Sequence, residues 1–162
     1  MPVNRVCLWV VIAFLSAWIA PLVASAAAAS PPGAVIGIHP SCEVDTFAPG
    51  AKLYTNRDYV VAECPDALRG RPLLRGSIDW VEIECLEPGE ITVLTPDPVH
   101  ETAKKCSRFK ELEEAGFRRI DEGRVFQLFG QQPFDVVRTY RKTLTKGERL
   151  RLRKWAVVTG FL

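Results

Sequence analysis

Two carboxylates two residues apart, Glu82 and Glu84, are the residues whose type and spacing come nearest to catalytic chemistry. They lie in "DWVEIEC", where alternating apolar residues predict a β-strand with both acids on one face. Side chains at this spacing are about 7 Å apart at their bases, which suits a pair of glycosidase acids. Such enzymes, however, take their two acids from opposite sides of a cleft. We therefore interpret the pair as a solvated strand face.

Trp80 belongs to the same face of the predicted strand, where the alternation predicts exposure. Sugar rings stack on exposed aromatic side chains, so a tryptophan flanked by hydrogen-bond acceptors can form a carbohydrate platform. The alternative is that another layer covers it, because tryptophan buries a large area. Our candidate ligand-binding residues are Trp80, Glu82 and Glu84.

No other set of residues predicts catalysis. The chain has no G-x-S-x-G nucleophile motif. Its two histidines, His39 and His100, both neighbour prolines or proline-rich segments and are interpreted as surface residues. We expect a protein that is not an enzyme and that needs no cofactor.

Charge divides unevenly along the chain. Residues 27–100 hold 5 Lys/Arg against 11 Asp/Glu, whereas residues 101–162 hold 15 against 8. One explanation is that acidic strands pair with basic strands in one sheet. The other is a basic face, suited to an extracellular polyanion and formed by Arg138, Arg149, Arg151 and Arg153. Nucleic acid is not expected, because no aromatic residues alternate with these arginines.

Four cysteines follow the first 26 residues: Cys42, Cys64, Cys85 and Cys106. An even number in an exported chain favours two disulfides, with three possible connectivities. Pairing of the strands that end at Cys64 and Cys85 would argue against a 64–85 bridge. A zinc site fails on spacing, since the cysteines stand about twenty residues apart and no C-x-x-C pair exists. No metal site is expected.

The first 26 residues have the layout of a secretory signal peptide. Arg5 precedes an apolar run, and an alanine-rich segment after Pro21 offers an A-x-A cleavage site. The alternative is an uncleaved N-terminal anchor. We expect cleavage after Ala26, then a flexible leader over residues 27–35 and one domain over residues 36–162. The mature protein would be secreted or periplasmic, with no membrane contact.

The remaining pattern is mainly of strands. "DWVEIEC" and "ITVLT" flank the turn "EPGE", which predicts a hairpin, and a second hairpin is predicted around Thr145-Lys146-Gly147. Further strands are expected at "DYVVAEC", "FRRI" and "RVFQLF", the first of them after a Thr55-Asn56-Arg57-Asp58 turn. One helix is expected over about residues 102–115, ended by Gly116. The pattern indicates a mainly β fold, an antiparallel β-sandwich with one short helix.

The segments "LYTNRDYVVAECPDALRGRPLLRGS" and "VRTYRKTLTKGERLRLRKW" resemble the opening and closing of a β-rich accessory domain of secreted multidomain bacterial proteins. That domain is found beside glycoside hydrolase, sulfatase or sialate-esterase-like modules. The resemblance covers about residues 50–162 and implies an accessory role without catalytic residues. The four cysteines and the lack of an enzyme module in this sequence depart from it.

The sequence therefore predicts a secreted, non-catalytic β-sandwich module that binds an extracellular carbohydrate or similar ligand. The alternative is a structural or protein-interaction domain of the cell envelope that uses the basic sheet face.

Overall fold

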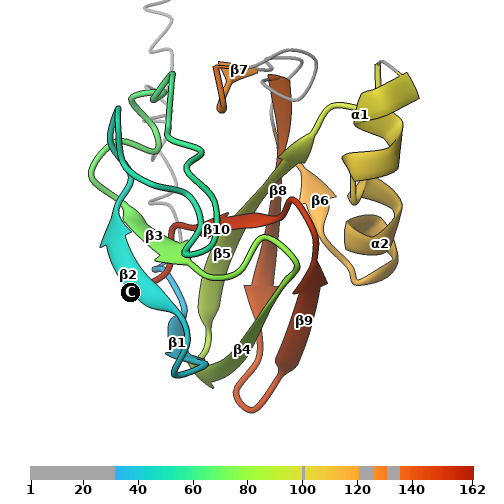
Figure 1. Ribbon diagram of the computed structural model, residues 1–162. Coiled ribbons are helices and arrows are strands. Elements are labelled where there is room, and N and C mark those ends of the chain that lie inside the picture. The colour runs from blue at the N-terminus through green and yellow to red at the C-terminus, as the bar shows by residue number, and fades with distance from the viewer. Residues whose placement is uncertain (1–31, 100, 121–125, 131–135) are drawn as a thin grey trace, which may run out of the picture.

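A computed structural model describes residues 32–99, 101–120, 126–130 and 136–162. The fold is mainly β, with two antiparallel sheets that pack together and two short helices (Figure 1). The predicted sandwich is confirmed. The described elements are β1 (Val35–Ile38), β2 (Glu43–Thr46), β3 (Pro72–Arg75), β4 (Trp80–Glu87), β5 (Gly89–Pro96), α1 (Glu101–Cys106), α2 (Phe109–Glu114), β6 (Arg118–Arg119), β7 (Phe126–Gln127), β8 (Val136–Leu144), β9 (Arg149–Arg153) and β10 (Val157–Thr159).

The smaller sheet has the strand order β1-β4-β9. Its two longer strands alternate as the sequence predicts. Val81 and Ile83 lie opposite Leu152 and Leu150 and face inward, while the residues between them face outward. This alternation produces one apolar and one charged face.

The larger sheet has the order β2-β3-β10-β5-β8-β6, and β7 also pairs with β8. Its central strand β5 is buried along almost its whole length. Ile91 and Val93 point to one side of the sheet and Leu94 to the other, so both faces of this sheet are covered.

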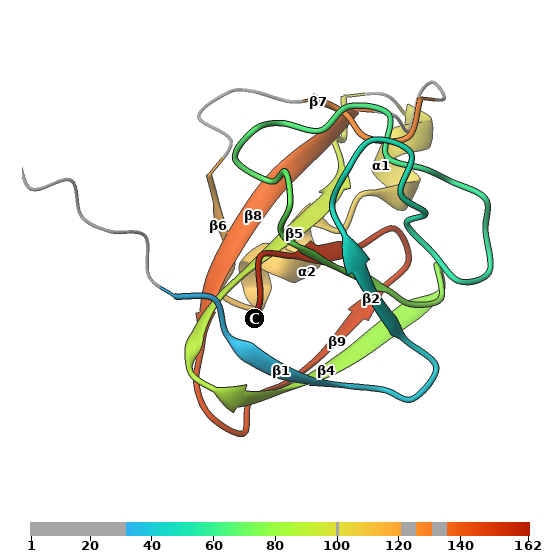
Figure 2. The ribbon, with the colours of Figure 1, turned by 90° about the vertical axis from the view of Figure 1, so that its left-hand side faces the viewer.

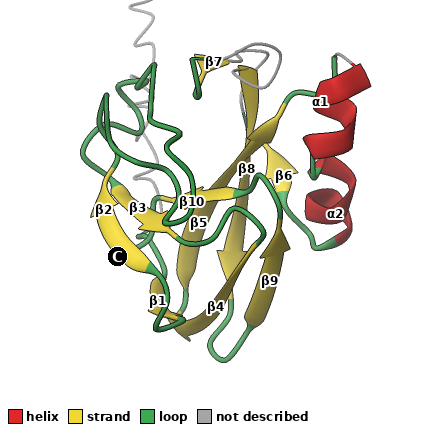
Figure 3. Ribbon diagram, in the orientation of Figure 1, coloured by secondary structure: helices red, strands yellow, loops and turns green. Residues whose placement is uncertain are grey.

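Two apolar cores result. The first lies between the sheets and reaches α2, through residues such as Ile83, Val93 and Leu112. The second lies on the far face of the larger sheet, where the loop over residues 47–70 covers it with Phe47 and Leu53, among others. The molecule thus has three layers: the small sheet, the large sheet and this loop layer (Figure 3).

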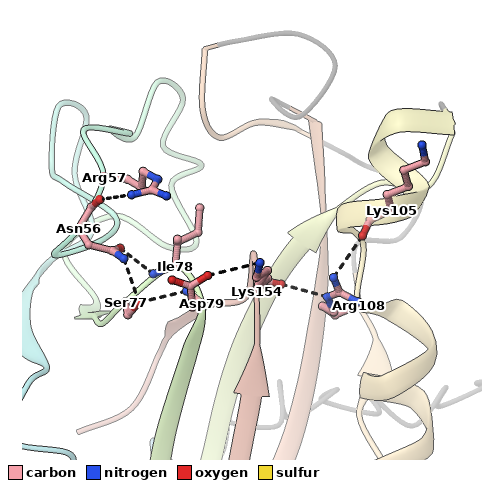
Figure 4. A network of polar contacts seen from close by, with 8 residues as sticks. All are labelled: Asn56, Arg57, Ser77, Ile78, Asp79, Lys105, Arg108 and Lys154. Carbon is pink, nitrogen blue, oxygen red and sulfur yellow. Dashed lines mark hydrogen bonds and ion pairs between the residues drawn. The ribbon is translucent and has the colours of Figure 1, made fainter.

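The Thr55-Asn56-Arg57-Asp58 segment belongs to the loop layer. The Asn56 side chain accepts a hydrogen bond from the backbone N–H of Ile78 at 2.9 Å and donates one to the Ser77 hydroxyl at 3.0 Å (Figure 4). Asp58 forms an ion pair with Lys52 at 3.0 Å. The segment therefore fastens the loop layer to the start of β4. The strand predicted to follow it at "DYVVAEC" is wrong, because only Val60 forms a bridge there, to Lys52.

Both predicted hairpins are also wrong. β4 pairs with β1 and β9, whereas β5 pairs with β10 and β8. The two strands meet at a corner of the molecule, where the chain changes sheet at Pro88 (Figure 2). The Thr145-Lys146-Gly147 turn likewise joins β8 of the large sheet to β9 of the small one.

The predicted helix is divided into α1 and α2. Between them Ser107 is buried, and the backbone N–H of Arg108 donates to the Thr95 hydroxyl at 2.9 Å. This hydrogen bond to β5 takes the place of a hydrogen bond within the helix, and it separates α1 from α2. The chain leaves α2 through Gly116, whose φ of +84° suits glycine.

The predicted disulfides are absent, and all four described cysteines are free thiols. Cys85 lies in the first core, and Cys42 packs against it. Cys64 packs instead against the second core, and Cys106 ends α1. The even cysteine count therefore does not reflect pairing.

Ordered contacts begin before residue 36. Gly33 forms a bridge with Glu90, Ala34 is fully buried, and Val35 begins β1. These residues, assigned from the sequence to a leader, contact the domain. The predicted signal segment lies outside the described residues. No helix in the described part of the chain is long and apolar enough to cross a membrane.

Candidate functional site

The outward side of the small sheet collects most of the residues singled out from the sequence. We call it the outer face. β4 contributes Trp80, Glu82 and Glu84, and β9 contributes Arg149, Arg151 and Arg153. The register places Trp80 opposite Arg153, Glu82 opposite Arg151 and Glu84 opposite Arg149. The acidic and basic halves of the sequence therefore meet across these two strands.

Trp80 is half-buried and is held by two neighbours. The Arg151 guanidinium carbon lies 5.2 Å from the centre of the Trp80 ring, a cation–π contact. The His39 ring lies 5.4 Å away at 74°, a T-shaped arrangement. These contacts fix the orientation of the indole and leave part of its surface accessible.

The two glutamates differ in their partners. Arg149 contacts Oε2 of Glu84 through Nη2 at 2.9 Å and through Nε at 3.1 Å. Glu82 is exposed and forms no ion pair with any described residue. Both acids belong to the same strand, rather than to opposite walls of a cleft.

Arg138 is not part of the outer face. It belongs to β8 in the large sheet and forms an ion pair with the buried carboxylate of Asp97. The structure brings together Arg149, Arg151 and Arg153 but not this fourth arginine. His100 lies outside the described residues.

A cavity of about 440 Å³ opens at the Trp80 end of the outer face. We call it the basic hollow. Four cations line it, together with one carboxylate and one aromatic ring: Arg108, Arg151, Arg153, Lys154, Asp79 and Trp80.

Hydrogen bonds and an ion pair position the far wall of the basic hollow (Figure 4). Asp79 pairs with Lys154 at 3.5 Å, and Arg108 Nε donates to the backbone carbonyl of Lys154 at 3.2 Å. Arg108 also donates to the carbonyl of Lys105 at 3.1 Å, which ties the wall to α1. The helix break thus supplies a cation to the sheet face.

A second cavity, of about 340 Å³, lies further along the outer face. Its lining includes His39, Glu82, Glu84, Leu86 and Arg149. The two hollows both adjoin residues in contact with Trp80, since Arg151 lines one and His39 the other.

Sequence reasoning did not identify Arg108, Lys154 or Asp79 as site residues. Asp79 directly precedes Trp80, and Lys154 directly follows β9, so their positions beside the predicted strands were available signals. Arg108 had no such signal, because it reaches the sheet only through the break between α1 and α2.

No metal site is recognisable in the described ranges, since they hold no group of three or more histidine, cysteine or acidic residues suited to a metal ion. The outer face presents an aromatic ring, carboxylates and guanidinium groups. These can stack on a sugar and hydrogen-bond its hydroxyl groups and anionic substituents.

Comparison with known protein families finds no match, and no curated protein matches the chain. Among solved structures, the chain is similar to part of a GH138 enzyme targeting pectin rhamnogalacturonan II. The TM-score is 0.57 at 16% sequence identity, over 81% of this chain. The chain corresponds to only 16% of that enzyme's length. The similarity therefore shows a shared fold with one portion of a carbohydrate-active enzyme.

Proposed function

We propose that this protein is an exported, non-catalytic module that binds a carbohydrate on the outer face of the small sheet. The observation that carries the proposal is Trp80, a half-buried indole at the wall of a hollow, held by Arg151 and His39. The ring supplies an apolar platform for the C–H face of a sugar. The surrounding carboxylates and guanidinium groups supply hydrogen bonds to its hydroxyl groups.

The fold gives secondary support. One portion of a GH138 enzyme shares it, and large carbohydrate-active enzymes combine catalytic and accessory parts. Since that enzyme targets a pectin polysaccharide, pectin belongs in the panel of ligands to be tested. The sequence resemblance to an accessory domain of secreted proteins favours the same role.

A role without catalysis agrees with the placement of the two glutamates. Glu84 is held by Arg149, and Glu82 lies on the same strand, so neither faces the other across a bound sugar. Incubation of the purified protein with each bound polysaccharide should release no reducing ends. Release that is lost in Glu84→Gln would show hydrolysis and overturn this part of the proposal.

The test of binding is titration calorimetry of the purified protein against neutral and anionic polysaccharides, pectin included. We expect Trp80→Ala to weaken binding about tenfold or more, equivalent to at least about 1.4 kcal/mol, and Trp80→Phe to retain part of it. Val44→Ala is the matched control, because Val44 is 55% exposed on β2 of the other sheet. Unchanged affinity in Trp80→Ala for every ligand would refute the platform.

A second candidate is a protein-interaction domain of the cell envelope that uses the basic hollow. It is favoured by Arg153, an exposed cation that pairs with no acid in the described part of the chain. A contact driven by charge weakens as salt shortens the Debye length to about 8 Å near 0.15 M. Stacking of a sugar ring on Trp80 would change little with salt, so binding that survives high salt and is lost in Trp80→Ala favours the glycan.

A further inference from the structure

The basic hollow has an excess of positive charge that the protein itself does not neutralise. Its single lining carboxylate, Asp79, pairs with Lys154. Arg108 pairs with Glu111 on α2 at 3.3 Å. The other two cations, Arg151 and Arg153, form no ion pair with any residue that the structure describes.

The missing pair is informative because an acid stands opposite Arg151. Glu82 faces it across β4 and β9, yet the Arg151 guanidinium lies over the Trp80 ring instead. Elsewhere on the same two strands, Arg149 does pair with the glutamate opposite it. The cations at the Trp80 end thus remain available to an external anion.

We infer that the basic hollow binds the anionic substituent of a sugar residue, a carboxylate or a sulfate group, while the sugar ring contacts Trp80. This inference rests on the proposed function and gives its ligand class: an anionic glycan. Arginine suits this role, since its planar guanidinium can form two parallel hydrogen bonds with a carboxylate or a sulfate-like group.

The geometry couples the two contacts. Arg151 lies 5.2 Å from the Trp80 ring centre, so its N–H donors stand beside any sugar that touches the indole. Arg153 lies directly opposite Trp80 in the strand register, and Arg108 approaches from the helix break. These three cations line the same hollow as the aromatic ring, which favours a charged sugar over a neutral one.

The experiment compares binding of the purified protein to polygalacturonate, which carries carboxylates, to dextran sulfate, and to unmodified dextran, which is neutral. The variants are Trp80→Ala and the double variant Arg151→Gln/Arg153→Gln. Lys146→Gln is the matched control, because this exposed lysine lies in the turn at the far end of β9. Thermal unfolding of each variant shows that it is folded.

We expect at least one anionic polymer to bind more tightly than dextran. The double arginine variant should lose about tenfold or more of that affinity, as expected when hydrogen bonds to a charged group are removed. Trp80→Ala should also lose affinity for the anionic polymer, and Lys146→Gln should bind as the unmodified protein does. The preferred polymer identifies the substituent as carboxylate or sulfate.

The contrary results are distinct. If dextran binds as tightly as both anionic polymers, and binding depends on Trp80 but not on the arginines, this inference is overturned. The proposed function is then retained. Binding of anionic polymers that ignores Trp80 indicates general polyanion attraction and overturns both. The absence of binding to any glycan overturns both as well.

Discussion

Glu84 and Arg149 face each other across β4 and β9, and two nitrogens of the guanidinium contact the same carboxylate oxygen, at 2.9 and 3.1 Å. The pair joins the acidic half of the sequence to the basic half. Three more pairs do the same, Asp79–Lys154, Glu90–Arg141 and Asp97–Arg138. Much of the charge division seen in the sequence is therefore neutralised within the fold.

The Glu84–Arg149 pair should add little stability despite its geometry. The two side chains are 41% and 71% exposed, and pairs of this kind contribute about 0.2–1 kcal/mol. A double-mutant cycle with Glu84→Gln and Arg149→Gln, measured by urea unfolding, should give a coupling energy below about 1 kcal/mol that falls in high salt. A coupling energy above about 2 kcal/mol would contradict this and indicate an ion pair that is more rigid and less accessible to water.

Glu148 should give the protein a pH-dependent stability. Burial raises the pKa of its carboxyl, but hydrogen bonds from Lys142 and Thr145 outweigh burial, and the pKa is lowered. Because the pKa of Glu148 is lower in the folded than in the unfolded protein, its ionised form stabilises the fold at pH values above the unfolded pKa of about 4.5. This stabilisation is lost as the pH falls through the pKa of the folded protein. We expect Glu148→Gln to lower the free energy of unfolding by about 1 kcal/mol at pH 7, and to leave it unchanged below the pKa of the folded protein.

Chemical denaturation at several pH values tests this, with Lys146→Gln as the control in the same turn. If Glu148→Gln were as destabilising in acid as at pH 7, the cause would be packing rather than the charge of the carboxylate.

The four cysteines should behave as slowly reacting thiols. Burial raises the pKa of Cys42, Cys64, Cys85 and Cys106, so little of each is thiolate near neutral pH. Iodoacetamide should label the native protein slowly and the unfolded protein rapidly at all four sites, as mass spectrometry would show. A reducing agent should leave the melting temperature unchanged. Loss of about 2–5 kcal/mol of stability on reduction would instead reveal disulfides.

Gly89 should tolerate no larger residue. A Cβ there would lie 2.5 Å from the backbone of Gly33 and of Ala34, which cannot move aside as a flexible side chain can. Gly89→Ala should therefore cost about 2 kcal/mol or more in urea unfolding. Gly37→Ala is the matched control, because its Cβ would make only ordinary contacts, with the Leu86 side chain at 3.5 Å and the Glu84 carbonyl oxygen at 3.7 Å. Equal stability of the two variants would contradict the close approach.

The sequence predicts the faces of individual strands well. Alternation in β4 and β9 identifies Val81, Ile83, Leu150 and Leu152 as inward and the charged residues as outward. This succeeds because the period of two is local, and a sheet with one buried face enforces it.

The sequence does not predict which strands pair with one another. Pro88 and Gly147 mark turns correctly, yet each turn connects two sheets rather than two paired strands. A turn signal indicates that the chain changes direction, whereas pairing depends on which apolar faces meet in the core. The basic hollow could not be predicted for the same reason, because Arg108 reaches Lys154 across 46 residues of sequence.

The changes of sheet at Pro88 and at the turn over residues 145–147 also affect how this chain folds. The strands they connect cannot stabilise each other as local hairpins, so β4 must find β1 and β9, and β5 must find β8 and β10. Nearly every pair of strands must therefore close a long loop of the chain before its backbone hydrogen bonds can form. A topology of such high contact order folds slowly, over milliseconds to seconds. Until those partners are found, the edges of β4 and β5 are unpaired, and exposed strand edges favour aggregation during folding.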